Sequence, residues 1–272
     1  MKLAISGKGG VGKTTIAAAL INFFAREGYV VYAVDADPDT SLGMVLGLPE
    51  ERLGTLKPIV DMRELIAART GGDGAFFSLN PDVDGFMDDY TIKRGNILFL
   101  KMGAIKPGGS TCYCRENAVL NAMINSLILK RKEMVVLDMG AGIEHLTRGT
   151  ARGVDIMLII TEPTLVSIQT ARVVQKLAGE LGIKRIKFVG NKIRRPRDEE
   201  FILEHLPPED VVALIPFQSE ILDRATCINE EPLIPSNIDD LAVELLSLMS
   251  PGHKGENRSS PVQFNENYMP RR

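Results

Sequence analysis

The chain has 272 residues, of which 44% are hydrophobic and 25% are charged, the composition of a globular protein with a core of ordinary size. The net charge of -3 argues against a general nucleic-acid binder, and the longest purely apolar stretch, residues 156–160, is too short to span a bilayer. Three cysteines are too few for a disulfide framework, and the first glycine loop begins too close to Met1 to leave room for a cleaved signal peptide. We therefore expect a cytoplasmic protein without a membrane partner.

Short apolar strands alternate with amphipathic helices along most of the chain. Gly28 is placed to end the first helix. The alternation predicts one α/β domain over residues 1–249, with a doubly wound, mostly parallel sheet and helices on both faces. Residues 70–95 are expected to form a surface excursion, and residues 250–272 a flexible tail. The expected strands are 2–6, 30–34, 97–100, 134–137, 156–160, 186–189 and 211–215, and the clearest helices are 14–27, 115–130, 165–181 and 238–248.

A glycine-rich loop follows the first predicted strand. Residues 7–14, GKGGVGKT, match the pattern G-x-x-x-x-G-K-[ST], with the preceding strand and following helix that this pattern requires. The glycines let backbone N–H groups converge on a phosphate. Lys13 is expected to reach the β- and γ-phosphates, and the Thr14 hydroxyl to bind Mg²⁺. The loop therefore predicts a P-loop NTPase fold; a glycine-rich turn that binds nothing is the alternative.

Acidic residues follow two predicted strands, at the edge of the sheet where ligands bind in such folds. Asp138 ends a buried run and is expected to hold Mg²⁺, although an ordinary aspartate at a loop start would look the same. Residues 35–39, DADPD, offer three carboxylates. We favour Asp37 as the group that orients or deprotonates the attacking water and as a further Mg²⁺ ligand, because Pro38 stiffens the chain after it.

Cys112 and Cys114 are separated by one residue in a glycine-flanked loop. Residues two apart in an extended segment point to the same side, so both thiolates can bind one soft metal ion. A closed tetrahedral site needs four ligands, and a two-fold dimer would supply the other pair. The alternative is two incidental cysteines near a helix start.

The nonapeptide GKGGVGKTT, residues 7–15, resembles the deviant Walker A ATPases. This class includes the nitrogenase iron protein, septum-site and partition ATPases, and several metal-insertion factors. The resemblance implies that ATP is the nucleotide and that Lys8 reaches across a dimer interface to the partner's nucleotide. A cation delivered in this way stabilises charge on the transferring phosphoryl group, so Lys8 and Lys13 are both expected to be catalytic.

The same resemblance implies which residues contact the nucleotide. Asn191 and Lys192, expected just after a strand, look like the base-recognition segment of the class, and Pro216 begins its adenine-contacting loop. Phe217 could equally belong to the core. The implied nucleotide-binding residues are Gly7, Lys8, Gly9, Gly10, Val11, Gly12, Lys13, Thr14, Thr15, Asn191, Lys192, Pro216 and Phe217.

Three segments together resemble the CooC family, nickel-insertion ATPases that mature carbon monoxide dehydrogenase and, in related members, acetyl-CoA synthase. The segments are 35–39, 108–117 (GGSTCYCREN) and 138–148 (DMGAGIEHLTR). The resemblance covers residues 1–248 and implies a homodimer that closes on ATP and on nickel or zinc held by the paired Cys112 and Cys114. Hydrolysis would then open the dimer and pass nickel to the client apo-enzyme.

Two other functions remain open. An electron donor like the nitrogenase iron protein would need a second cysteine in the segment that corresponds to 138–148, which has none. A positioning ATPase of the MinD or ParA type would need a basic membrane helix or a DNA-binding patch. The predicted helix 238–248 is instead acidic on its polar side.

Overall fold

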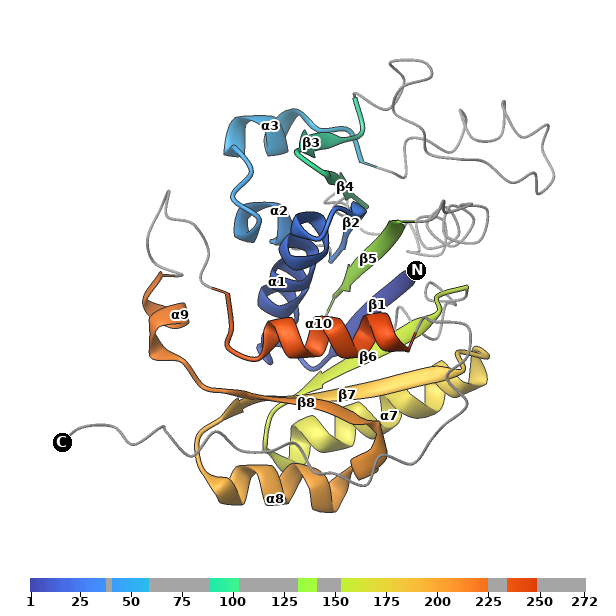
Figure 1. Ribbon diagram of the computed structural model, residues 1–272, viewed down its shortest axis with the longest axis vertical. Helices are drawn as coiled ribbons and strands as arrows, with labels where there is room; N and C mark the ends of the chain where they lie inside the picture. The colour runs from blue at the N-terminus through green and yellow to red at the C-terminus, as the bar shows by residue number, and fades with distance from the viewer. Residues whose placement is uncertain (38–40, 59–88, 103–131, 141–152, 225–233, 249–272) are drawn as a thin grey trace, which may run out of the picture.

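The computed structural model describes residues 1–37, 41–58, 89–102, 132–140, 153–224 and 234–248 (Figure 1). Within these residues one eight-stranded sheet has the order β3-β4-β2-β5-β1-β6-β7-β8. Neighbouring strands are parallel except β3, which runs antiparallel to β4 at one edge. The doubly wound sheet is therefore confirmed. Its strands are β1 (Lys2–Gly7), β2 (Val30–Ala36), β3 (Ile92–Arg94), β4 (Ile97–Lys101), β5 (Glu133–Met139), β6 (Ile156–Thr161), β7 (Arg185–Ile193) and β8 (Val211–Pro216).

Helices connect most of the strands. Helix α1 begins directly after the glycine loop, and Gly28, with φ 80°, follows its C-cap as the sequence predicted. The described helices are α1 (Lys13–Arg26), α2 (Leu42–Val45), α3 (Glu50–Thr55), α7 (Leu165–Glu180), α8 (Pro196–His205), the 3₁₀ turn η2 (Pro208–Asp210), α9 (Ser219–Arg224) and α10 (Ile238–Ser247).

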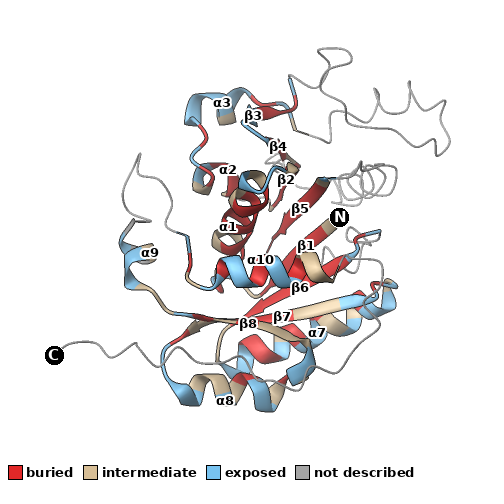
Figure 2. Cartoon of the chain, viewed as in Figure 1, coloured by how far each residue is buried: buried red, intermediate tan, exposed pale blue. Residues whose placement is uncertain are grey.

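Each face of the sheet buries its own hydrophobic core, because neighbouring side chains on a strand point to opposite faces. On β1, Leu3 and Ile5 pack with α1, α2 and α10, whereas Ala4 packs with α7 and α8. The inner strands are buried along nearly their whole length (Figure 2). This two-sided burial explains why the strands are continuous apolar runs in the sequence.

The structure differs from the sequence-based expectations at several points. Ile92–Arg94 forms strand β3 inside the region expected to be a surface excursion. Asp138 and the pair Asn191–Lys192 lie within β5 and β7, not after them. The predicted helix 115–130 and the predicted tail 250–272 lie outside the described residues.

No helix in the described part of the chain is both long enough and apolar enough to cross a membrane.

Candidate nucleotide-binding site

The glycine loop leaves the end of β1, in the middle of the sheet, and leads into α1. Gly7, Gly10 and Gly12 have φ values of 145°, 80° and 97°, which side chains of other residues rarely allow. A Cβ atom on Gly7 would lie 2.2 Å from the Ile160 carbonyl oxygen, and one on Gly12 would lie 2.5 Å from Asn191 Nδ2. The loop is therefore packed directly against β6 and β7. At Gly7 the obstacle is backbone, so only glycine fits, whereas at Gly12 the Asn191 side chain would have to move.

Lys13, in the first turn of α1, is a buried cation inside this loop. Only 7% of its surface is exposed, and its Nζ donates a hydrogen bond to the Lys8 carbonyl oxygen at 3.2 Å. Burial lowers the pKa of Lys13, while the nearby carboxylates of Asp138 and Asp37 oppose this effect. A buried charge without a partner costs free energy. A phosphate bound in the loop would give the Lys13 ammonium an anionic partner and so offset this cost.

Two buried carboxylates lie side by side near the carboxyl ends of the neighbouring strands β2 and β5. The parallel pairing of β2 with β5 places Asp35 opposite Asp138, and the two residues are 0% and 1% exposed. Asp35 accepts hydrogen bonds from the backbone N–H groups of Leu42 and Asp37, at 3.0 and 3.2 Å. Neither carboxylate oxygen of Asp138 has a hydrogen-bond partner among the described residues.

This burial disfavours negative charge on both groups. Loss of solvent, and then the charge of Asp138, raise the pKa of Asp35 to about 7. Loss of solvent raises the pKa of Asp138 to about 6, although the neighbouring Thr14 hydroxyl and Lys13 ammonium favour its ionised form. A cation bound at Asp138 would relieve this penalty.

The residues present fit a magnesium ion. Mg²⁺ prefers oxygen ligands, and Asp138 offers two oxygens that have no hydrogen-bond partner in the described part of the chain, beside the half-buried Thr14. The Thr14 Oγ1 atom lies 3.5 Å from the hydroxyl of Ser41, the residue that precedes α2. Asp37 follows β2 directly, and its backbone is held by Asp35. The three predicted magnesium ligands Thr14, Asp37 and Asp138 therefore gather at the carboxyl ends of the central strands.

The predicted base-recognition residues gather on the neighbouring strands β7 and β8. Pro216 is exposed and pairs with Ile193, whose carbonyl oxygen accepts a hydrogen bond from the Phe217 N–H at 2.8 Å. The Arg194 guanidinium lies 4.3 Å from the centre of the Phe217 ring, within cation–π range. Phe217 is thus half-buried at the surface under an arginine.

Asn191 and Lys192 contact the glycine loop itself. The Asn191 side-chain amide donates to the Val11 carbonyl oxygen at 2.7 Å, and Lys192 Nζ donates to the Gly10 carbonyl oxygen at 2.5 Å. Their expected contact with a nucleobase stays a prediction.

Sequence reasoning did not give Asp35 a role separate from Asp37. Its burial could be suspected from its position directly after the apolar run 30–34, but its pairing with Asp138 depends on strand order, which no local pattern reveals. Cys112 and Cys114 lie outside the described residues. The described residues contain no group of three or more histidine, cysteine, aspartate or glutamate side chains arranged to hold a metal ion.

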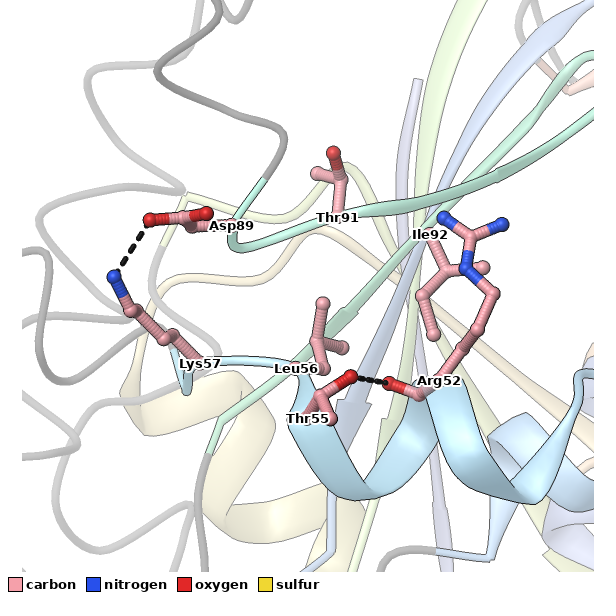
Figure 3. A pocket seen from close by; sticks show the side chains of 7 residues that line it. All are labelled: Arg52, Thr55, Leu56, Lys57, Asp89, Thr91 and Ile92. Carbon is pink, nitrogen blue, oxygen red and sulfur yellow. Dashed lines mark hydrogen bonds and ion pairs between the residues drawn. The ribbon is translucent and has the colours of Figure 1, made fainter.

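A separate shallow pocket of about 200 Å³ lies between α3 and β3, at the edge of the sheet (Figure 3). Two of its lining residues form an exposed ion pair, in which Lys57 Nζ is 2.6 Å from Asp89 Oδ2. None of the predicted site residues lines it. The lining residues are Arg52, Thr55, Leu56, Lys57, Asp89, Thr91 and Ile92.

Comparison with known proteins shows which family the chain belongs to. The family described as "CobQ/CobB/MinD/ParA nucleotide binding domain" matches residues 2–226. The carbon monoxide dehydrogenase accessory protein CooC of Rhodospirillum rubrum is 41% identical over 258 residues, which cover 92% of this chain and 98% of that protein. An uncharacterized ATP-binding protein of Methanocaldococcus jannaschii is 42% identical over 229 residues, covering 82% of this chain and 87% of its own.

Among solved structures, the MinC:MinD cell division complex of Aquifex aeolicus superposes with a TM-score of 0.65 at 22% identity, covering 97% of this chain and 98% of the other. At this identity the likeness shows the fold alone. The sequence matches go further: the chain belongs to the CobQ/CobB/MinD/ParA family of nucleotide-binding domains and, within it, to the family of the accessory protein CooC.

Proposed function

We propose that the protein is a Mg²⁺-dependent ATPase. The observation that carries this proposal is the buried carboxylate of Asp138, which lacks a hydrogen-bond partner among the described residues and lies beside the Thr14 hydroxyl and the buried Lys13 ammonium. Loop N–H groups and Lys13 would bind the phosphates, and Thr14 and Asp138, with Asp37, would hold the magnesium ion. Bound magnesium would neutralise phosphate charge as the terminal phosphoryl group is transferred.

Hydrolysis needs a positioned water molecule and a compensating charge. Asp37 would orient or deprotonate the water, since Asp35 fixes its backbone at the edge of the sheet beside the loop. Lys8 would supply charge in trans, to the nucleotide of the second subunit of a homodimer. The backbone of Lys8 is held by Lys13 through its carbonyl group, and its side chain is half-exposed, which leaves it accessible to a second copy.

We further propose that the ATPase carries a metal ion as cargo. Cys112 and Cys114 from each of two subunits would bind one nickel or zinc ion at the dimer interface. The client would be a nickel enzyme, carbon monoxide dehydrogenase or acetyl-CoA synthase. The support is the similarity to an accessory protein of carbon monoxide dehydrogenase over 92% of the chain.

The cargo site can be tested by metal binding to purified protein. Cys112→Ala and Cys114→Ala should each abolish tight nickel and zinc binding while basal ATP hydrolysis continues, because the thiolates are absent from the phosphate loop. Cys227→Ala, which removes the third cysteine, is the matched control and should bind metal normally. Tight binding retained in both single variants would contradict the proposed site.

The client can be tested by reconstitution. The apo-forms of carbon monoxide dehydrogenase and of acetyl-CoA synthase would each be incubated with the nickel-loaded protein, with and without ATP. ATP-dependent activation of one enzyme identifies the client. Activation of neither, from protein that binds nickel and hydrolyses ATP, would contradict the insertion role. An iron–sulfur absorbance in anaerobically purified protein would favour an electron donor, and ATP-dependent sedimentation with lipid vesicles a positioning ATPase.

A further inference from the structure

Strand β7 carries an irregularity at the point where it passes the glycine loop. Between Gly190 and Ile193 it advances three residues while β8 advances two, from Leu214 to Pro216, so β7 contains one extra residue. Lys192 sits in this bulge with φ 62°, a left-handed conformation that costs an L-residue roughly 1–2 kcal/mol. Backbone strain of this kind persists where the surrounding contacts compensate for it.

The bulge allows two consecutive side chains to reach the same loop. In a regular strand, Asn191 and Lys192 would point to opposite faces of the sheet. Here both donate to adjacent carbonyl groups of the glycine loop, Asn191 to Val11 and Lys192 to Gly10. Lys192 Nζ also lies 3.5 Å from Glu162 Oε2, just beyond the end of β6, so the ammonium is tethered on a second side.

These contacts set the direction of the loop's N–H groups. In a trans peptide unit the C=O of one residue and the N–H of the next point in opposite directions. Holding the Gly10 carbonyl toward Lys192 therefore turns the Val11 N–H away from β7. In the same way, holding the Val11 carbonyl toward Asn191 turns the Gly12 N–H away. Both N–H groups are then directed to the side of the loop opposite the strand that braces it.

We propose that Asn191 and Lys192 are positioning residues of the phosphate loop, which hold the Gly10 and Val11 carbonyls outward so that the following N–H groups bind the phosphates of ATP. This rests on the proposed nucleotide site. It differs from a base-recognition role because its effect falls on the phosphates and is independent of the nucleobase.

The test compares ATP with inorganic tripolyphosphate, which has the phosphates but no base. Affinities would be measured with Mg²⁺ by competition against a fluorescent ATP analogue. Lys192→Met keeps the aliphatic stem and removes the hydrogen-bond donor. The variant should lose affinity for ATP and for tripolyphosphate by the same factor, about tenfold or more for a charged hydrogen bond. Lys192→Arg retains a donor and should restore much of both affinities. Lys187, also on β7, has its ammonium paired with Asp210 of η2, so Lys187→Met is the matched control and should change neither affinity.

Three results would overturn the proposal: a loss of ATP affinity with tripolyphosphate affinity unchanged, no loss for either ligand, or failure of tripolyphosphate to compete in the unaltered protein. Urea denaturation of each variant separates a loop effect from unfolding, because a positioning role predicts lost affinity in a protein that is still folded. If the unaltered protein does not bind ATP, the proposed function fails instead, independently of the Lys192 variants.

Discussion

Replacement of Asp138 by asparagine should stabilise the nucleotide-free protein while removing its response to magnesium. Asp138 is 1% exposed, and burial raises its pKa from 3.8 to about 6. Each pKa unit corresponds to about 1.4 kcal/mol, so the ionised carboxylate costs the folded state roughly 3 kcal/mol. The asparagine amide would also find no hydrogen-bond partner among the described residues, which costs about 1–3 kcal/mol, so the expected net gain is at most about 2 kcal/mol.

Because the pKa of Asp138 is raised in the folded protein, the free energy of unfolding depends on pH. The folded protein binds the Asp138 proton more tightly than the unfolded chain does, so wild-type stability falls as pH rises from about 4 to about 6 and the full cost applies above that window. The gain in stability of Asp138→Asn over wild type should therefore be larger at about pH 8 than at about pH 5. At about pH 5 the ionised carboxylate costs the wild-type protein only about half of its full free-energy penalty.

Urea denaturation without nucleotide at these two pH values measures the effect. Asp239→Asn removes the same charge from a 64%-exposed side chain and should change the free energy of unfolding by no more than about 0.5 kcal/mol. With ATP present, added Mg²⁺ should stabilise wild type and fail to stabilise Asp138→Asn. The reasoning is refuted if wild type is at least as stable as Asp138→Asn at about pH 8, or if the variant keeps the full magnesium response.

Two further predictions concern the glycine loop. Lys8→Ala should bind ATP but hydrolyse it poorly and dimerise less, since its proposed role is in trans; ATPase assays with light scattering check this, and a fully active variant would exclude the role. Gly7→Ala should destabilise the protein by roughly 3 kcal/mol or more, because its Cβ would meet a backbone oxygen at 2.2 Å. Gly182→Ala, at φ 82° with open space around the position, should cost only about 1 kcal/mol by thermal or urea denaturation, and equal losses in the two variants would contradict the packing argument.

Much of the fold could be predicted from the sequence because the strands are buried on both faces. Each continuous apolar run predicted to form a strand lies in a strand of the sheet, which extends beyond it by one or more residues. β3 was missed because its sequence, IKR, is short and two of its three residues are exposed at the sheet edge. Helix α8 was missed because its polar sequence buries only Ile202.

The sequence predicts those parts of the site that are formed by residues close together along the chain. The glycine pattern between a strand and a helix identifies the phosphate loop by itself. The opposition of Asp35 and Asp138 depends on β2 pairing with β5, which are far apart along the chain. Nothing nearby marks Lys192 as left-handed, since lysine is not typical of that conformation and the bulge arises from pairing with β8.

The two adjacent carboxylates also couple occupancy of the site to the acidity of the solution. With pKa values of about 7 and about 6, Asp35 and Asp138 hold part of a proton between them near neutrality. A divalent ion arriving at Asp138 would expel that proton into the buffer. Binding of the divalent ion, and of a nucleotide that depends on it, should then weaken as the pH falls through this range.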